Sequence, residues 1–113
     1  MRRVRGHHDF EADYLAQLRW LAERGEDAWM QGLLEGTQRI VSVLADFPAM
    51  GSKQDTRGSV ELRSLRYPTL PYVVWYVYDP TDTGSDLWLV RLFHSHQQRP
   101  RPDLSRWLPP RGN

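Results

Sequence analysis

The stretch Glu61–His96, ELRSLRYPTLPYVVWYVYDPTDTGSDLWLVRLFHSH, decides the fold. Two apolar segments, Tyr72–Tyr78 and Leu87–Phe93, are separated by the sequence DPTDTGSD, whose Pro, Gly and short polar side chains favour a turn. The stretch therefore predicts a β-hairpin. Its first segment is aromatic and β-branched without polar alternation, which is typical of a central strand that other elements cover.

Upstream of this hairpin, apolar residues recur at helical spacing. A first helix is predicted with Asp9 as its N-cap and Gly25 at its stop. A second helix begins near Glu26 or Asp27 and ends before Pro48. Because the connection is very short, the two helices are expected to form an antiparallel hairpin. The apolar face of the first helix consists of Phe10, Tyr14, Leu18 and Leu21.

The second helix contains two glycines four residues apart, Gly32 and Gly36. Each costs about 1 kcal/mol relative to Ala in a helix interior. Their presence therefore predicts a close backbone approach, which we assign to the first helix. The residues at helical spacing here are Met30, Leu33, Thr37, Ile40, Val41, Leu44 and Phe47.

The remaining segments complete a small sheet. Residues 2–7 are interpreted as an edge strand or an irregular lead-in, and residues 48–59 as a polar loop. Residues 60–65 alternate as a strand with one polar face, and the prolines in residues 67–71 indicate a turn. The basic tail, about 97–113, is expected to be irregular, with one helical turn that docks Trp107.

This order of elements is that of an α+β protein. We expect a single domain over residues 1–113, large enough to bury one core. In it, a short N-terminal strand and the antiparallel helical hairpin pack on one face of a small, mainly antiparallel β-sheet.

The composition excludes several classes of protein. With no cysteine, the chain has no disulfide, thiol nucleophile or thiolate metal site. No apolar run approaches the roughly 18 residues of a membrane span. The basic N-terminus continues into charged residues rather than into the apolar core of a secretory signal. We therefore expect a cytoplasmic protein without a membrane partner.

Charge is distributed unevenly along the chain. Residues 1–56 carry 7 Lys or Arg and 9 Asp or Glu, a net charge of −2, whereas residues 57–113 carry 8 Arg and 5 Asp or Glu, a net charge of +3. Positive potential is thus concentrated in the hairpin end and the tail, where a polyanion or an acidic partner could bind. A solvated basic tail explains the same pattern.

The order of elements and several motifs together resemble the RelE/ParE superfamily of bacterial type II toxins. The resemblance rests on a helix that closes on Leu44-Ala-Asp-Phe-Pro48, a Gly-containing loop and the sequence Leu62-Arg-Ser-Leu-Arg66. A Tyr-led apolar strand follows, and a last strand ends in Val90-Arg-Leu-Phe-His94. The combination covers nearly the whole chain and is more specific than any of its parts.

This resemblance implies a toxin that arrests growth and is neutralised by a cognate antitoxin. RelE-like members of the superfamily cleave mRNA on the ribosome, whereas ParE-like members inhibit DNA gyrase. Both activities use one fold, so the residues must decide between them. Of the two, we favour ribosome-dependent mRNA cleavage by a slight margin, with inhibition of DNA gyrase through the helical hairpin and basic tail as the alternative.

RNA cleavage through the 2′-hydroxyl needs a base, an acid for the leaving oxygen and cations that stabilise charge at phosphorus. It requires neither a metal nor a cofactor. His94, His96 and Arg91 are the candidate catalytic residues, because His titrates near neutrality and Arg carries a permanent charge. The candidate phosphate- or RNA-binding residues are Arg63, Arg66 and Arg99.

Strand geometry constrains this constellation. In a regular strand Arg91 and His94 face opposite sides, whereas His94 and His96 share a side. Unless a bulge or the strand end intervenes, Arg91 therefore cannot join both histidines in one site. Two departures from the nuclease members also favour the alternative: Tyr72-Val73 stands where many have Tyr-Arg, and no tyrosine follows Tyr78.

Two further groups of residues have plainer interpretations. His7 and His8 could bind a metal, but without an organised carboxylate partner we expect them to be exposed to solvent. Trp75 is expected to pack in the core rather than stack on bases. We expect packing roles for Trp20, Trp29 and Trp88 as well, although Trp29 could serve the antitoxin interface.

Overall fold

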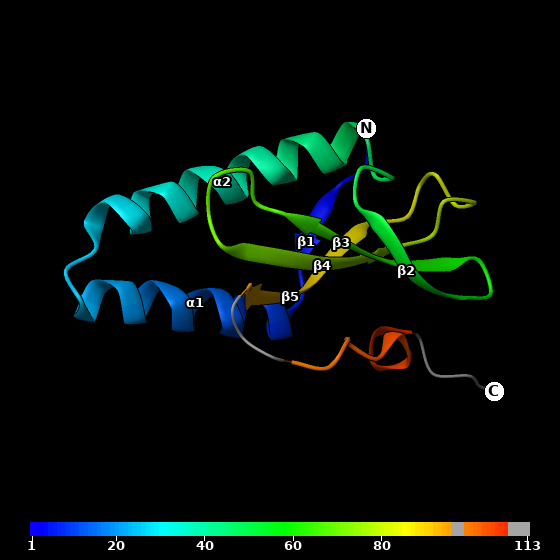
Figure 1. Ribbon diagram of the computed structural model, residues 1–113. Coiled ribbons are helices and arrows are strands. Elements are labelled where there is room, and N and C mark those ends of the chain that lie inside the picture. Colours follow the sequence, from blue (N-terminus) through cyan, green and yellow to red (C-terminus); the bar gives the residue numbers. More distant parts are fainter. Residues whose placement is uncertain (96–98, 109–113) are drawn as a thin grey trace.

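The computed structural model describes residues 1–95 and 99–108 (Figure 1). Its strands and helices follow the predicted order with one addition. They are β1 (Val4–Gly6), α1 (His8–Glu23), α2 (Asp27–Asp46), β2 (Ser52–Arg57), β3 (Val60–Arg66), β4 (Tyr72–Tyr78), β5 (Leu87–His94) and the short 3-10 helix η1 (Leu104–Trp107).

The described strands form one sheet in the order β1-β5-β4-β3-β2. Strand β1 pairs with β5 in parallel, and the other neighbours pair antiparallel. The predicted hairpin is β4 and β5, and β4 lies in the middle of the sheet with most of its residues buried. Two helices on a small, mainly antiparallel sheet confirm the predicted α+β class.

Helices α1 and α2 form the predicted antiparallel hairpin (Figure 1). Gly25, in the turn between them, has a φ of 69°, which glycine adopts without steric cost. The prediction of Asp9 as the N-cap of α1 is wrong. The N-cap is His7, whose Nδ1 accepts a hydrogen bond of 3.0 Å from the backbone N–H of Asp9. Strand β1 ends at Gly6 and α1 already begins at His8, which is before the start that Asp9 as N-cap would give. No described helix is long and apolar enough to cross a membrane.

The helix faces agree with the predicted periodicity at most positions. Phe10 and Leu21 of α1 and Leu33, Thr37, Ile40 and Leu44 of α2 are buried. The periodicity assigns Phe47 to this face as well, but Phe47 lies beyond the end of α2 and is 63% exposed.

The close approach predicted at the two glycines is made to a different partner. A Cβ on Gly36 would lie 3.2 Å from Cδ2 of Tyr67, and one on Gly32 would lie 3.7 Å from the methyl carbons of Leu70. The two glycines therefore allow the turn between β3 and β4 to pack closely against α2. The nearest side chains at both positions belong to this turn, not to α1.

Strand β2 is the addition to the predicted elements. The sequence predicts a loop over residues 48–59, but Ser52–Arg57 pairs antiparallel with β3, from Ser52 opposite Ser64 to Arg57 opposite Val60. Gly58 has a φ of 59°, which suits the two-residue turn that joins the strands. All residues of β2 are polar because it is an edge strand, exposed along much of its length.

The sheet has an apolar cluster on each face. Helical residues pack against Tyr72, Val74, Tyr76, Leu89 and Leu92 on one face. On the other, Leu104 of η1, with Trp107 packed against the cluster, covers Leu62, Val77 and Val90. Figure 1 shows η1 on the side of the sheet opposite α2.

The structure confirms some of the predictions for the tryptophans and contradicts others. Docking of Trp107 by a helical turn is confirmed, and Trp75 and Trp88 pack against the second cluster. The prediction is wrong for Trp20 and Trp29, which are 45% and 42% exposed.

Candidate functional site

Side chains of β4 alternate between the two faces of the sheet. Tyr72 and Val74 pack with the helices, so Val73 and Trp75 point to the other side. Strand pairing extends this side into two rows, Arg66–Val73–Phe93 and Ser64–Trp75–Arg91. We call the side of the sheet that these six residues share the outer face.

Arg91 is held on the outer face by an ion pair with α1. Its Nε and Nη2 donate to the Asp13 carboxylate at 2.7 and 3.2 Å. The same carboxylate accepts the backbone N–H of Leu92 at 2.9 Å, beyond the point where β1 stops pairing with β5. The guanidinium carbon of Arg91 lies 4.8 Å from the centre of the Phe93 ring. Arg91 is therefore fixed in position, with part of its hydrogen-bonding capacity used by the fold.

Arg99 and Arg66 add positive charge to the outer face. The guanidinium carbon of Arg99 lies 5.1 Å from the centre of the Phe93 ring. Arg66 is exposed, and it makes no hydrogen bond or ion pair with the residues that the structure describes. A groove of about 570 Å³ adjoins it, lined by Met50, Gly51, Ser52, Gln54, Ser64, Leu65, Arg66, Val73 and Trp75. Arginines beside aromatic rings provide phosphate binding and base stacking.

His94 lies on the opposite face from Arg91. It pairs with Tyr72, and the two rings meet edge to face with their centres 5.4 Å apart. Strand β5 does contain a bulge, because Trp75 pairs with Arg91 while Tyr76 pairs with Leu89. The bulge precedes Arg91, so the alternation from Arg91 to His94 is unbroken. The two residues are separated as strand parity predicted.

His94 instead lines a pocket at the turn of the helical hairpin. We call it the hairpin-tip pocket; its volume is about 230 Å³ and its lining is Trp20, Leu21, Arg24, Glu26, Trp29, Tyr72 and His94. The guanidinium carbon of Arg24 lies 4.4 Å from the centre of the Trp20 ring. Two partly exposed tryptophans, a cation and an imidazole give this pocket the composition of a protein-binding anchor site.

Arg63 serves the fold on the helical face. Its Nε donates to Glu61 at 2.8 Å, and its Nη1 donates to the carbonyl oxygens of Ala49 and Gly51 at 3.2 and 2.7 Å. The side chain is 14% exposed. Burial alone would raise the pKa of Glu61, but the hydrogen bond and charge of Arg63, together with the charge of Lys53 and a hydrogen bond with Tyr78, lower that pKa. Arg63 thus ties the loop before β2 to β3.

The structure therefore brings Arg66, Arg91 and Arg99 to one face, whereas His94 and Arg63 point to the other. Arg99 also reaches His94 at the end of β5, because both line a pocket of about 510 Å³ with Ala16, Gln17 and Trp20. His96 lies outside the described residues. Sequence reasoning missed Asp13, which orients Arg91, and Gln54, whose Nε2 donates to Ser64 Oγ at 3.0 Å across the groove. It also missed the exposure of Trp20. Only Asp13 had a detectable signal, as an acidic residue in the first turns of a helix.

Comparison with known proteins identifies the fold and the family of the chain. A two-helix hairpin on a mainly antiparallel sheet is the fold of RelE-type toxins: the structure is similar to the archaeal RelE–RelB complex from Pyrococcus horikoshii, with a TM-score of 0.56, 19% identity, and coverage of 86% of this chain and 98% of that chain. The family model described as the ParE toxin of the type II toxin–antitoxin system parDE matches residues 4–99. The chain belongs to this family and is the toxin of a type II toxin–antitoxin system. A comparison with curated protein sequences found no significant match.

Proposed function

We propose that this toxin arrests growth by binding and inhibiting DNA gyrase, without catalysing a reaction of its own. The observation that carries the proposal is the separation of Arg91 from His94 on opposite faces of the sheet. RNA cleavage needs cation, acid and base around one phosphate. Since Arg91 and His94 point to opposite faces, they do not share a site of this kind, which supports gyrase inhibition over the cleavage that we slightly favour from the residues alone.

The hairpin-tip pocket is the surface that we assign to the target protein. Trp20 and Trp29 expose 45% and 42% of their area beside Arg24 and His94. Tryptophan and arginine are the residues most enriched among those that dominate protein–protein binding energies. The basic tail would add long-range attraction to an acidic surface.

A cognate antitoxin is the second partner that we propose. The similar archaeal structure is a complex of RelE with RelB. By analogy, an antitoxin would cover the surface through which this toxin reaches its target. Both partners would meet the toxin in the cytoplasm.

Ribosome-dependent mRNA cleavage is the second candidate function, and one observation favours it. Arg91 and Arg99 both lie against Phe93, with Arg66 in the same row and a groove beside Trp75. This arrangement suits a nucleic-acid backbone with a stacked base. His96, or His94 in the pocket that it shares with Arg99, would then supply the acid or base.

Pulse-labelling after induced expression tests the two candidates directly. Thymidine and methionine incorporation are followed in parallel over the first minutes. Under the proposal, thymidine incorporation falls first while translation continues, and the purified toxin inhibits gyrase supercoiling. Early loss of methionine incorporation would overturn the proposal in favour of RNA cleavage.

A further inference from the structure

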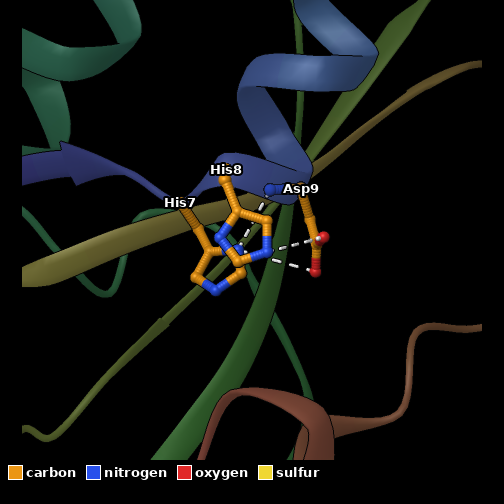
Figure 2. A group of neighbouring side chains, drawn as sticks. All are labelled: His7, His8 and Asp9. Atoms are coloured by element: carbon orange, nitrogen blue, oxygen red, sulfur yellow. Dashed lines mark hydrogen bonds and ion pairs between the residues drawn. The ribbon is translucent and has the colours of Figure 1, made fainter.

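Three potential metal ligands meet where β1 passes into α1. The Nδ1 of His7 lies 3.5 Å from Oδ2 of Asp9, and the Nε2 of His8 lies 3.5 Å from Oδ1 of Asp9. All the candidate ligand atoms of His7, His8 and Asp9 lie within 4.8 Å of one another. Figure 2 shows both imidazoles directed toward the same carboxylate.

Two of these separations match the ligand spacing around a small tetrahedral cation. With metal–ligand bonds of about 2.0–2.2 Å, neighbouring ligands of a tetrahedral Zn²⁺ lie about 3.3–3.6 Å apart. The two N···O distances of 3.5 Å fall within that range, each to a different oxygen of the carboxylate. To bind the ion, Nδ1 of His7 would have to release the backbone N–H of Asp9, from which it accepts the N-cap hydrogen bond. The centres of the two imidazole rings lie 4.0 Å apart and their candidate ligand nitrogens within 4.8 Å, so the rings would have to rotate for both nitrogens to face one ion.

Part of this cluster is already held in position without a metal ion. Asp9 has a side chain only 13% exposed, and its carboxylate accepts hydrogen bonds from Arg106 and Trp107 of η1. The side chain of His7 is 26% exposed and that of His8 is 81% exposed. The ion would therefore enter from the solvent side, past His8. The organised carboxylate that the sequence did not reveal is Asp9 itself.

We propose that His7, His8 and Asp9 bind one first-row transition-metal dication of the Zn²⁺ type, and that this ion competes with Arg106 for the Asp9 carboxylate. Two imidazoles and one carboxylate are the ligands of Zn²⁺, whereas Mg²⁺ and Ca²⁺ prefer oxygen. Three protein ligands leave the fourth position to water. The proposal is independent of the toxin's target.

The competition follows from the charges around Asp9. Arg106 donates from Nε to Oδ2 at 2.7 Å and from Nη2 to Oδ1 at 3.0 Å, and Trp107 donates from Nε1 to Oδ2 at 3.1 Å. A dication on the same oxygens would repel the guanidinium. The positive end of the α1 dipole opposes the ion as well, so affinity should be moderate rather than that of a structural zinc site. Metal binding would loosen the contact between α1 and η1.

Calorimetric titration of the tag-free full chain with ZnCl₂ near neutral pH tests the site. We expect binding of one Zn²⁺ per chain and none of Mg²⁺. His8→Ala should weaken Zn²⁺ binding by about tenfold or more, since loss of a ligand costs at least as much as loss of an outer-shell partner. His7→Asn should do the same, while its side-chain oxygen still caps α1. His94→Ala, on the far end of β5, is the matched histidine control and should bind Zn²⁺ unchanged.

Arg106→Ala tests the competition separately. Because the substitution removes the cation that Zn²⁺ must displace, Zn²⁺ should bind several-fold more tightly. Absence of Zn²⁺ binding, or binding that survives either His7→Asn or His8→Ala unchanged, would overturn the site. Unchanged or weaker binding to Arg106→Ala would overturn the competition. Circular dichroism of each variant excludes unfolding as the cause.

Discussion

Arg63 and Lys53 both contact Glu61, and they differ mainly in how far they are buried. The Nε of Arg63 lies 2.8 Å from Glu61 with its side chain 14% exposed, whereas Nζ of Lys53 lies 3.6 Å away with its side chain 52% exposed. Arg63→Ala also leaves the carbonyls of Ala49 and Gly51 without their donor. We expect it to lower the free energy of unfolding by about 2–3 kcal/mol.

Lys53→Ala is the matched control for this prediction. A solvent-exposed ion pair contributes about 0–1 kcal/mol, so the loss should be small. Urea denaturation of the two variants provides the comparison. Equal losses would show that the Arg63 contacts are not what fixes the loop.

Glu61 makes stability depend on pH at the acid end. Its pKa lies below the ordinary value of 4.5, because Arg63, Lys53 and Tyr78 together outweigh the effect of burial. The unfolded chain therefore takes up this proton first as pH falls. The stabilisation is complete above the ordinary pKa and is lost as pH falls through the lower folded value.

Glu61→Gln removes this titration and should flatten the acid end of the stability curve. Free energies of unfolding measured in urea from about pH 6 to about pH 3 provide the test. Identical slopes for the variant and the parent would show that other carboxylates carry the acid sensitivity.

Strand β2 depends on a close approach that a polar sequence does not reveal. A Cβ on Gly51 would lie 2.6 Å from the carbonyl oxygen of Ser64 and 2.8 Å from the hydroxyl of Tyr76. That hydroxyl accepts from the Gly51 N–H at 2.9 Å and donates to the carbonyl of Pro48 at 2.7 Å. Burial raises the pKa of Tyr76 to about 12, so the phenol remains a neutral donor.

Gly51→Ala should therefore displace the start of β2 and cost about 1–3 kcal/mol. Gly84→Ala is the matched control, since its nearest neighbour is Oδ1 of Asp82 at 3.7 Å. Its effect should stay within about 0.5 kcal/mol. Thermal unfolding compares the two, and amide hydrogen exchange in Ser52–Arg57 should rise only in Gly51→Ala. Unaltered exchange in these residues would show that β2 does not depend on the close approach at Gly51.

At the scale of the whole molecule, the features that could be predicted from the sequence are those that depend on the periodicity of side chains along a helix or strand. The helical faces, the β4–β5 hairpin and the separation of Arg91 from His94 follow from the alternation of side chains along regular elements. The pairing of β2, the role of Arg63 and the exposure of Trp20 follow from contacts between distant segments, and no local pattern encodes them.

The two faces of the sheet provide the test that separates the candidate functions within one molecule. Trp20→Ala with Trp29→Ala alters the hairpin-tip pocket, and Arg66→Ala with Arg99→Ala alters the outer face. All four side chains are exposed, so both double variants should fold. If the toxin binds gyrase through the pocket, the tryptophan pair should lose most of its toxicity and supercoiling inhibition, since central tryptophans often contribute about 2 kcal/mol or more to binding. The arginine pair should stay toxic. The reverse pattern, with the arginine pair harmless and the tryptophan pair toxic, would assign toxicity to the outer face and to RNA.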